Sequence, residues 1–294
     1  MVRMNRRDAT KAMLGGTAAL LARPLLARQW IDSVVRGVQI GAQSYSFRDS
    51  PLDACIQAFV TVGLGECELS QGHVEPAEGA VTREKLREWR LNTPLSYFQD
   101  VRKKFDAAGV RLYAYNYSFR HDMTEAEMRR GFEMTEALGV RYITASSNVS
   151  LAPAIDKLAQ EFKITVGFHG HDSTNPDEFS TPETFERALH GASQYLAINL
   201  DIGHFTAAGG DAVSFIREHH DRIVTLHIKD RKKNHGANLP FGEGDTPIVP
   251  VLQLLRDQRW RIPANIEYEY GKPGMDTIVE VKKCYAYCRK ALES

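Results

Sequence analysis

The chain has few cysteines, no net charge and no long apolar run, and each of these absences excludes a class of protein. Its 294 residues include four cysteines, and no two of them have the Cys-x-x-Cys spacing of zinc knuckles and thioredoxin-type redox sites. Basic and acidic residues number 37 each, so the chain has no overall attraction to nucleic acid. No apolar run reaches the roughly 20 residues of a membrane-spanning helix. We expect a globular protein without a nucleic-acid partner or a stable membrane span.

The first thirty residues differ from the rest and resemble an export signal. Arg6 and Arg7 precede a short, moderately apolar run at 12–26 that is rich in small residues. Paired arginines before such a run are typical of the twin-arginine route, so we predict that residues 1–30 are a signal segment and that the protein is exported or periplasmic. If this segment is instead an amphipathic helix, the protein is cytoplasmic.

From residue 37 to 294 the sequence alternates short apolar runs with longer stretches of helical periodicity. Eight of the apolar runs are predicted to be strands: 38–45, 65–69, 111–115, 141–145, 164–168, 196–201, 223–228 and 264–268. Strands that alternate with helices pair in parallel through right-handed crossovers. Eight such units in about 250 residues predict a single-domain (β/α)8 TIM barrel. No Gly-x-Gly-x-x-Gly follows the first run, which removes the usual sign of dinucleotide binding.

Four successive predicted strands end in residue types that bind metals, at the rim where such barrels place their active sites. These residues are His169, Asp201, His227 and Glu267. Each one alone has an ordinary explanation, since an aspartate after a strand commonly caps the next helix. Together they are costly to bring into one barrel mouth unless a cation or substrate compensates them. Two imidazoles with two carboxylates suit one divalent ion, and Mn²⁺, Co²⁺, Zn²⁺ or Fe²⁺ better than Mg²⁺.

Several motifs resemble those of the xylose-isomerase-like TIM barrels, a superfamily of sugar isomerases and epimerases. They are Asp201-x-Gly-His204, His227-x-Lys229-Asp230, Phe241-Gly-Glu-Gly-Asp245, and the segments 41–48 and 266–269. The resemblance covers nearly everything after the signal segment. It implies a sugar or keto-sugar substrate and a divalent metal ion whose ligands are His169, Asp201, His227 and Glu267.

The chain departs from the family pattern at the fifth strand. Many members have a glutamate there, which binds the metal and serves as a base, whereas this chain has His169 within a His-x-His sequence. The branch with this sequence includes proteins that look like enzymes acting on 3-keto-sugars or 3-keto-glycosides. The departure puts a mechanism with two carboxylates in doubt, but not metal binding, because neutral imidazole is a good ligand.

Further residues at the predicted rim are candidates for catalysis and substrate binding. Glu267 is the best carboxylate to move a proton, and Lys229 and His204 belong to the same motifs. Lys229 is expected to transfer a proton with a lowered pKa, to stabilise an enolate oxygen, or simply to form a salt bridge with a rim carboxylate. Substrate contacts are expected from Glu68, His73, His171, His121 and Tyr45. The basic triplet 231–233 is predicted to be a solvated loop.

Three functions are compatible with these residues. The favoured hypothesis is a metal-dependent isomerase or epimerase that acts on a sugar through an enediolate. A lyase or hydratase would use the same site to remove an aglycone or water from a 3-keto-glycoside by β-elimination, and His169 together with export supports this alternative. The third is a sugar-binding barrel without catalysis. Barrels of this kind frequently form homodimers, and the segments 74–89 and 119–123 are candidates for lids or subunit contacts.

Overall fold

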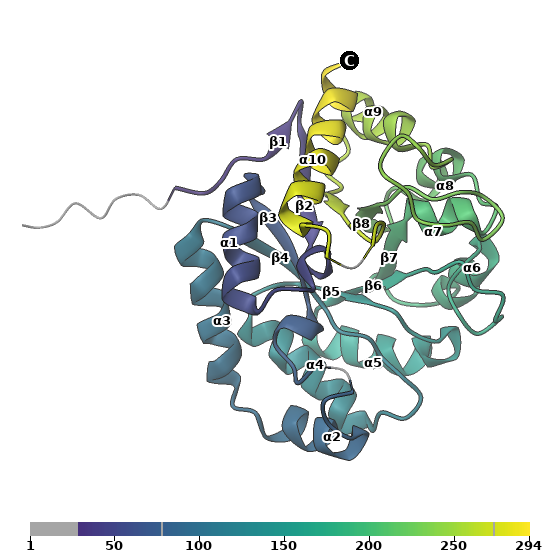
Figure 1. The fold of residues 1–294 in the computed structure, drawn as a ribbon. Helices are drawn as coiled ribbons and strands as arrows, with labels where there is room; N and C mark the ends of the chain where they lie inside the picture. The colour runs from purple at the N-terminus through teal and green to yellow at the C-terminus, as the bar shows by residue number, and fades with distance from the viewer. Residues whose placement is uncertain (1–28, 78, 273) are drawn as a thin grey trace, which may run out of the picture.

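The computed structural model describes residues 29–77, 79–272 and 274–294, which form a barrel of strands surrounded by helices (Figure 1). All but the last two residues of the predicted signal segment 1–30 lie outside the described residues. Within the described ranges, no helix is long and apolar enough to span a membrane. Export and a homodimer stay predictions.

Eight parallel strands close the barrel, which confirms the predicted TIM barrel. In chain order they are β2 (Val38–Gln43), β3 (Glu66–Ser70), β4 (Arg111–Asn116), β5 (Tyr142–Ala145), β6 (Thr165–His169), β7 (Leu196–Asp201), β8 (Ile223–Ile228) and β9 (Ala264–Ile266). Each strand pairs with the next, and β9 returns to pair with β2. The short β1 (Val34–Val35) is an antiparallel neighbour of β2.

Helices follow the strands and cover the outside of the barrel (Figure 1). They are α1 (Leu52–Val62), α2 (Arg83–Asn92), α3 (Leu95–Ala108), α4 (Glu125–Ala137), α5 (Ala152–Phe162), α6 (Pro182–Leu189), α7 (Ile202–Ala207), α8 (Ala212–His219), α9 (Ile248–Gln258) and α10 (Thr277–Glu293). Proline and glycine mark the two ends of α3. Pro94 is the N-cap of α3, and Gly109 follows that helix with a left-handed φ of 72°, which glycine adopts without strain.

Five strand ends differ from the predicted ones at the rim that carries the site, and two of them, those of β3 and β4, only run one residue further, to Ser70 and Asn116. β2 stops at Gln43 rather than 45, because the Gln43 side chain accepts a hydrogen bond from the backbone N–H of Tyr45 and turns the chain into the 3-10 helix η1 (Ser44–Phe47). β6 runs one residue further than predicted and includes His169. β9 stops at Ile266, so Glu267 begins the loop that follows the strand.

The inside of the barrel is polar, whereas the space between strands and helices is filled by apolar side chains. Hydrogen bonds cross the barrel from Glu68 in β3 to Thr144 in β5 and to His227 in β8. Gly41 in β2 is required here, since a Cβ at this position would lie 2.2 Å from Oδ1 of Asn265. All four cysteines are buried free thiols.

Candidate metal centre and its cavity

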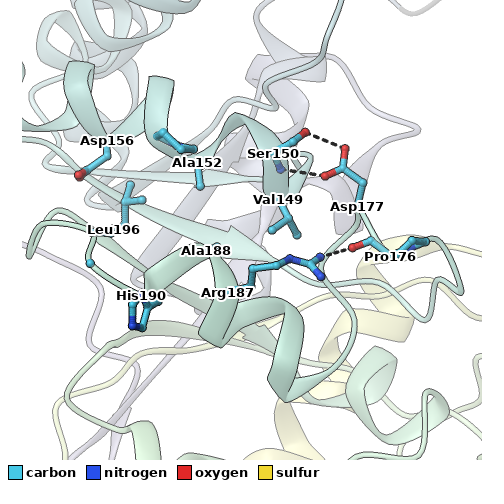
Figure 2. Close-up of a pocket in the computed structure, with 13 residues that line it drawn as sticks. Val149, Ser150, Ala152, Asp156, Pro176, Asp177, Arg187, Ala188, His190 and Leu196 are labelled. Carbon is cyan, nitrogen blue, oxygen red and sulfur yellow. Dashed lines mark hydrogen bonds between the residues drawn. The ribbon is translucent and has the colours of Figure 1, made fainter.

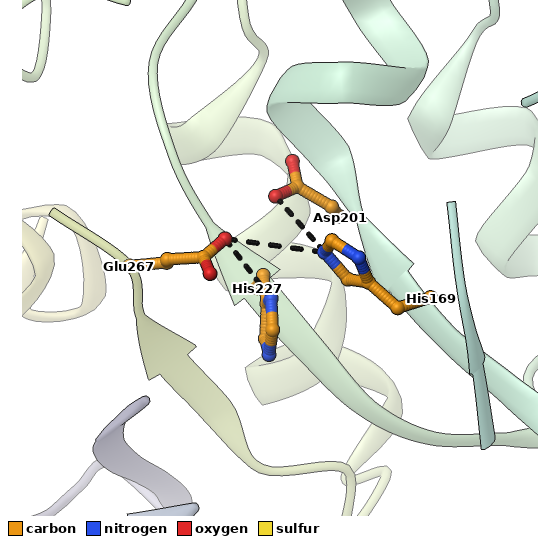
Figure 3. A group of neighbouring side chains, drawn as sticks. All are labelled: His169, Asp201, His227 and Glu267. Carbon is orange, nitrogen blue, oxygen red and sulfur yellow. Dashed lines mark hydrogen bonds and ion pairs between the residues drawn. The ribbon is translucent and has the colours of Figure 1, made fainter. Parts of the chain in front are cut away.

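Four side chains from four neighbouring strands converge at the carboxyl end of the barrel, as Figure 3 shows. They are those of His169, Asp201, His227 and Glu267, and one nitrogen or oxygen of each lies within 4.8 Å of the others. Nε2 of His169 lies 3.5 Å from Oδ2 of Asp201. Nδ1 of His227 lies 3.1 Å from Oε2 of Glu267. The structure thus brings together all four predicted ligands.

The chemistry of this group fits a divalent cation. Nε2 of His169 and Oδ2 of Asp201 are buried and have no hydrogen-bond partner among the described residues. Leaving a buried polar atom unpaired costs about 1–3 kcal/mol, so a bound ion would remove a penalty that the protein alone leaves in place. Two imidazole nitrogens and two carboxylate oxygens are the mixed donor set of zinc and related transition metals. A buried His/Asp/His/Glu group of this kind can hold one metal ion.

The two carboxylate oxygens of Asp201 make different contacts. Oδ1 accepts a hydrogen bond of 2.7 Å from the backbone N–H of His204 and thereby caps α7. Oδ2 faces the other converging atoms. Burial alone would raise the pKa of Asp201, but the charge of Lys229 and the ring of His204 hold it well below its usual range. The residue is therefore an ionised carboxylate that offers one oxygen to an ion.

Glu68 orients His227 from below the site. Its carboxylate lies 2.9 Å from Nε2 of His227, and its Oε1 accepts a hydrogen bond of 2.6 Å from the hydroxyl of Thr144. A carboxylate on the far nitrogen of a metal-binding histidine fixes the ring and raises its basicity. Glu68 is fully buried and does not line the cavity, so the predicted contact with sugar hydroxyls is not available from this position.

Lys229 is buried beside the carboxylates of the site. Its Nζ lies 2.7 Å from Oε2 of Glu269, 2.8 Å from Oε2 of Glu267 and 3.1 Å from Oδ2 of Asp201, the last without hydrogen-bond geometry. Burial alone would lower the pKa of Lys229, but the three carboxylates outweigh burial and raise the pKa. The predicted lowered pKa is therefore wrong, and the predicted salt bridge is confirmed. A charged lysine in this position can stabilise a developing oxyanion.

Two more imidazoles lie beside His169 and are neutral near pH 7. Burial and the neighbouring His169, His204 and Lys229 lower the pKa of His171 to about 3. Burial likewise lowers the pKa of His204, whose Nε2 lies 3.1 Å from Nζ of Lys229. Neutral imidazoles can exchange hydrogen bonds with hydroxyl groups, which suits a polyol substrate.

Arg231 supports His204 and was missed in the sequence. Its Nη1 lies 2.6 Å from Nδ1 of His204 and 2.8 Å from Oδ1 of Asp172. The prediction that the triplet 231–233 is solvated is wrong for this residue, which is only 8% exposed. A run of like charges gives no sign of a distant acidic partner, and Asp172 is 59 positions earlier in the chain.

Asp230 anchors the glycine-rich loop that follows β8. Its Oδ2 accepts hydrogen bonds from the backbone N–H groups of Gly242 and Gly244, and its Oδ1 accepts one from that of Thr246. A Cβ at Gly244 would lie 1.9 Å from Oδ1 of Asp230, so the loop cannot approach the aspartate with any other residue there. This contact explains why the His-x-Lys-Asp and Gly-rich motifs occur in one chain.

A cavity of about 870 Å³ opens over the four converging residues. Its lining includes three of the predicted substrate contacts, namely Tyr45, His73 and His171. Burial lowers the pKa of His73, whose Nε2 lies 2.9 Å from the carbonyl oxygen of Ser44. His121 does not line the cavity: its ring is 57% exposed and lies 3.1 Å from Oδ2 of Asp177, so the structure does not place it where it was predicted.

A second cavity of about 610 Å³ lies between α5 and α6 (Figure 2). Three of its polar groups are engaged within the lining: Asp177 accepts hydrogen bonds from the backbone and hydroxyl of Ser150, and Arg187 donates to the carbonyl of Pro176. None of the four converging residues lines it. The candidate site is therefore the cavity at the barrel mouth.

The chain belongs to the xylose isomerase-like TIM barrel family, whose model matches residues 80–287. It is 27% identical over 205 residues to the rhizopine catabolism protein MocC of Rhizobium meliloti, covering 62% of this chain and 58% of the relative. It is 30% identical over 79 residues to the inosose dehydratase of Bacillus velezensis, covering 26% of each chain. The matched stretches thus span less than two thirds of these relatives.

Solved structures share the fold at low sequence identity. A sugar phosphate isomerase/epimerase from Parabacteroides distasonis aligns with a TM-score of 0.61 and 17% identity, covering 90% of this chain and 97% of that one. The IolI protein, solved with a bound zinc atom, aligns with a TM-score of 0.61 and 15% identity, covering 87% of this chain and 96% of that one. At these identities the likeness establishes the architecture alone. Proteins named as isomerases, epimerases and dehydratases are among those that this chain resembles.

Proposed function

We propose that the protein is a metal-dependent lyase that acts on a keto-sugar. It removes a proton from the carbon next to the carbonyl, and the electron pair of that C–H bond then forms a double bond as the C–O bond to the β-substituent breaks. The departing oxygen takes up a proton and leaves as water or as an alcohol. The observation that carries this proposal is that the contacts of Glu267 with His227 and Lys229 use Oε2 alone, beside a cluster of imidazole rings formed by His169, His171 and His204.

His169, Asp201, His227 and Glu267 would hold the ion, with zinc, manganese, cobalt or iron(II) suiting the donor set better than magnesium. A bound divalent ion supplies Lewis acidity, which polarises the substrate carbonyl and acidifies the adjacent C–H. Glu267 is the base in this proposal. Its contacts with His227 and Lys229 both use Oε2, which leaves Oε1 to accept the proton. Its pKa is held low by Lys229 and His227 despite burial, so it is ionised at neutral pH.

Lys229 and the neutral imidazoles complete the chemistry. The Lys229 ammonium stays charged and can stabilise negative charge on a substrate oxygen. His171 and His204 are neutral imidazoles that can position substrate hydroxyl groups through hydrogen bonds. Removal of the proton by Glu267 from one side of the substrate favours an elimination over an epimerisation, because an epimerase must also return a proton to the opposite face. The name of the inosose dehydratase relative also supports an elimination.

Aldose–ketose isomerisation is the second candidate, because a single base can move a proton between adjacent carbons of an enediolate. Incubation of the metal-loaded protein in D₂O with a 3-keto-glucoside separates the two. A lyase releases the aglycone and leaves an unsaturated ketone that absorbs in the ultraviolet. An isomerase incorporates deuterium and releases no aglycone. A protein that binds metal and sugar but does neither is a binding barrel, which would contradict the proposal.

A further inference from the structure

The cavity over the ion site is larger than one sugar requires. At about 30 Å³ for each water-sized atom, its volume of about 870 Å³ holds roughly 29 non-hydrogen atoms, whereas a hexose has about 12. The remaining space extends to the side of β3 and β4, where it is lined by the segment before and within α2 and by the loop after β4. In Figure 1, α2 lies beside α4, away from α8. We call this part the α2 end.

A closed network of ion pairs holds the α2 end in place. It joins three arginines to three carboxylates: Arg83, Arg87, Arg90, Glu75, Asp122 and Glu127. Arg90 is buried, and its guanidinium lies 2.6 Å from Glu75 and 2.9 Å from Glu127. Because three positive charges meet three negative ones, the network is neutral. It fixes α2 to α4 and forms a rigid wall rather than a loose lid.

Arg120 adds a positive charge that this network does not balance. It lines the α2 end, and within the described parts of the chain no hydrogen bond or ion pair joins its side chain to another residue. Apolar side chains, those of Val81, Leu86 and Met123, line the same end. A guanidinium beside apolar surface recognises an oxyanion carried on an apolar body, since its planar donors match a carboxylate or phosphate.

We propose that the α2 end is a second subsite, which binds a group attached to the sugar ring, and that Arg120 pairs with a carboxylate or phosphate on that group. The inference rests on the proposed function for the position of the sugar ring at the ion site. It identifies the substrate class as a glycoside with an anionic aglycone rather than a free monosaccharide.

Calorimetry with unreactive ligands tests the subsite without turnover. The metal-loaded protein is titrated with glucose, phenyl glucoside, and phenyl glucosides that carry a carboxylate or a phosphate on the phenyl ring. We expect phenyl glucoside to bind more tightly than glucose, and at least one charged glucoside to bind about tenfold more tightly than phenyl glucoside, the gain typical of a hydrogen bond to a charged group. Arg120→Ala should abolish this tenfold gain and leave the affinity for phenyl glucoside within about twofold.

Arg217→Ala is the matched control, because Arg217 is an exposed arginine of α8 outside the cavity. A gain with only one of the two anions supports the subsite and identifies the oxyanion. Equal affinities for glucose and all glucosides, or equal effects of Arg120→Ala and Arg217→Ala, would overturn it. Leu86→Trp should weaken binding of phenyl glucoside but not of glucose. Failure of the proposed function is seen separately, as intact glucoside binding without turnover of any keto-sugar.

Discussion

Replacing Glu68 by glutamine should weaken metal binding, although Glu68 is not one of the four residues that would hold the ion. The carboxylate lies 2.9 Å from Nε2 of His227 and accepts the hydroxyl hydrogen bond of Thr144. Glutamine has nearly the same shape, but its amide carries no charge and only one acceptor oxygen. His227 then loses the anionic partner that holds its ring with Nδ1 directed at Glu267.

The expected loss is about 10- to 100-fold in affinity, or about 1.4–2.7 kcal/mol, as for other outer partners of metal-binding histidines. The upper part of this range is the more reasonable expectation, because Glu68 and His227 are both buried. Water therefore cannot take the place of the missing carboxylate oxygen.

Competition with a chromophoric chelator gives the dissociation constants for zinc and manganese. Glu66→Gln is the matched control, since Glu66 is a buried glutamate of the same strand, and no hydrogen bond or ion pair in the described structure joins it to His227. The reasoning is refuted if Glu68→Gln binds metal as tightly as the parent, or if both variants lose affinity equally.

Three further changes test other parts of the structure. Gly244→Ala should cost about 1–3 kcal/mol in urea unfolding because of its clash with Asp230, whereas Gly72→Ala, with 3.6 Å of space, should not. Burial raises the pKa of Glu66 from 4.5 to about 7, so the folded state keeps a proton that the unfolded state loses, and stability falls as pH rises through this window. Glu66→Gln should therefore gain up to roughly 3 kcal/mol on the parent between about pH 5 and pH 8, and a constant difference would contradict this. Glu127→Gln should cost about 1.5–3 kcal/mol because Arg83, Arg87 and Arg90 lose the buried carboxylate that they share, and a loss below about 1 kcal/mol would count against the network.

The four ion-site residues could be predicted because each ends or directly follows a strand, and a parallel barrel brings such ends to one rim. The side chains that contact these four residues could not be predicted in the same way. Glu68 and His227 are 159 positions apart, and no local pattern distinguishes a carboxylate that faces a sugar from one that faces a histidine. For the same reason the sequence predicts a solvated Arg231, whereas the structure buries it. His121 follows a strand too, but the chain has already left the rim at that point, and its ring turns to Asp177.

The proposed chemistry depends most directly on whether the barrel mouth holds a metal ion. Mass spectrometry of the purified protein, after reconstitution with zinc, manganese, cobalt and iron(II), gives the metal content without any assumption about the substrate. We predict about one equivalent of one of these metals in the parent and in Glu66→Gln, and its loss in His227→Ala and Glu267→Gln. A parent protein that retains no metal, or variants that retain as much as the parent, would contradict the central claim.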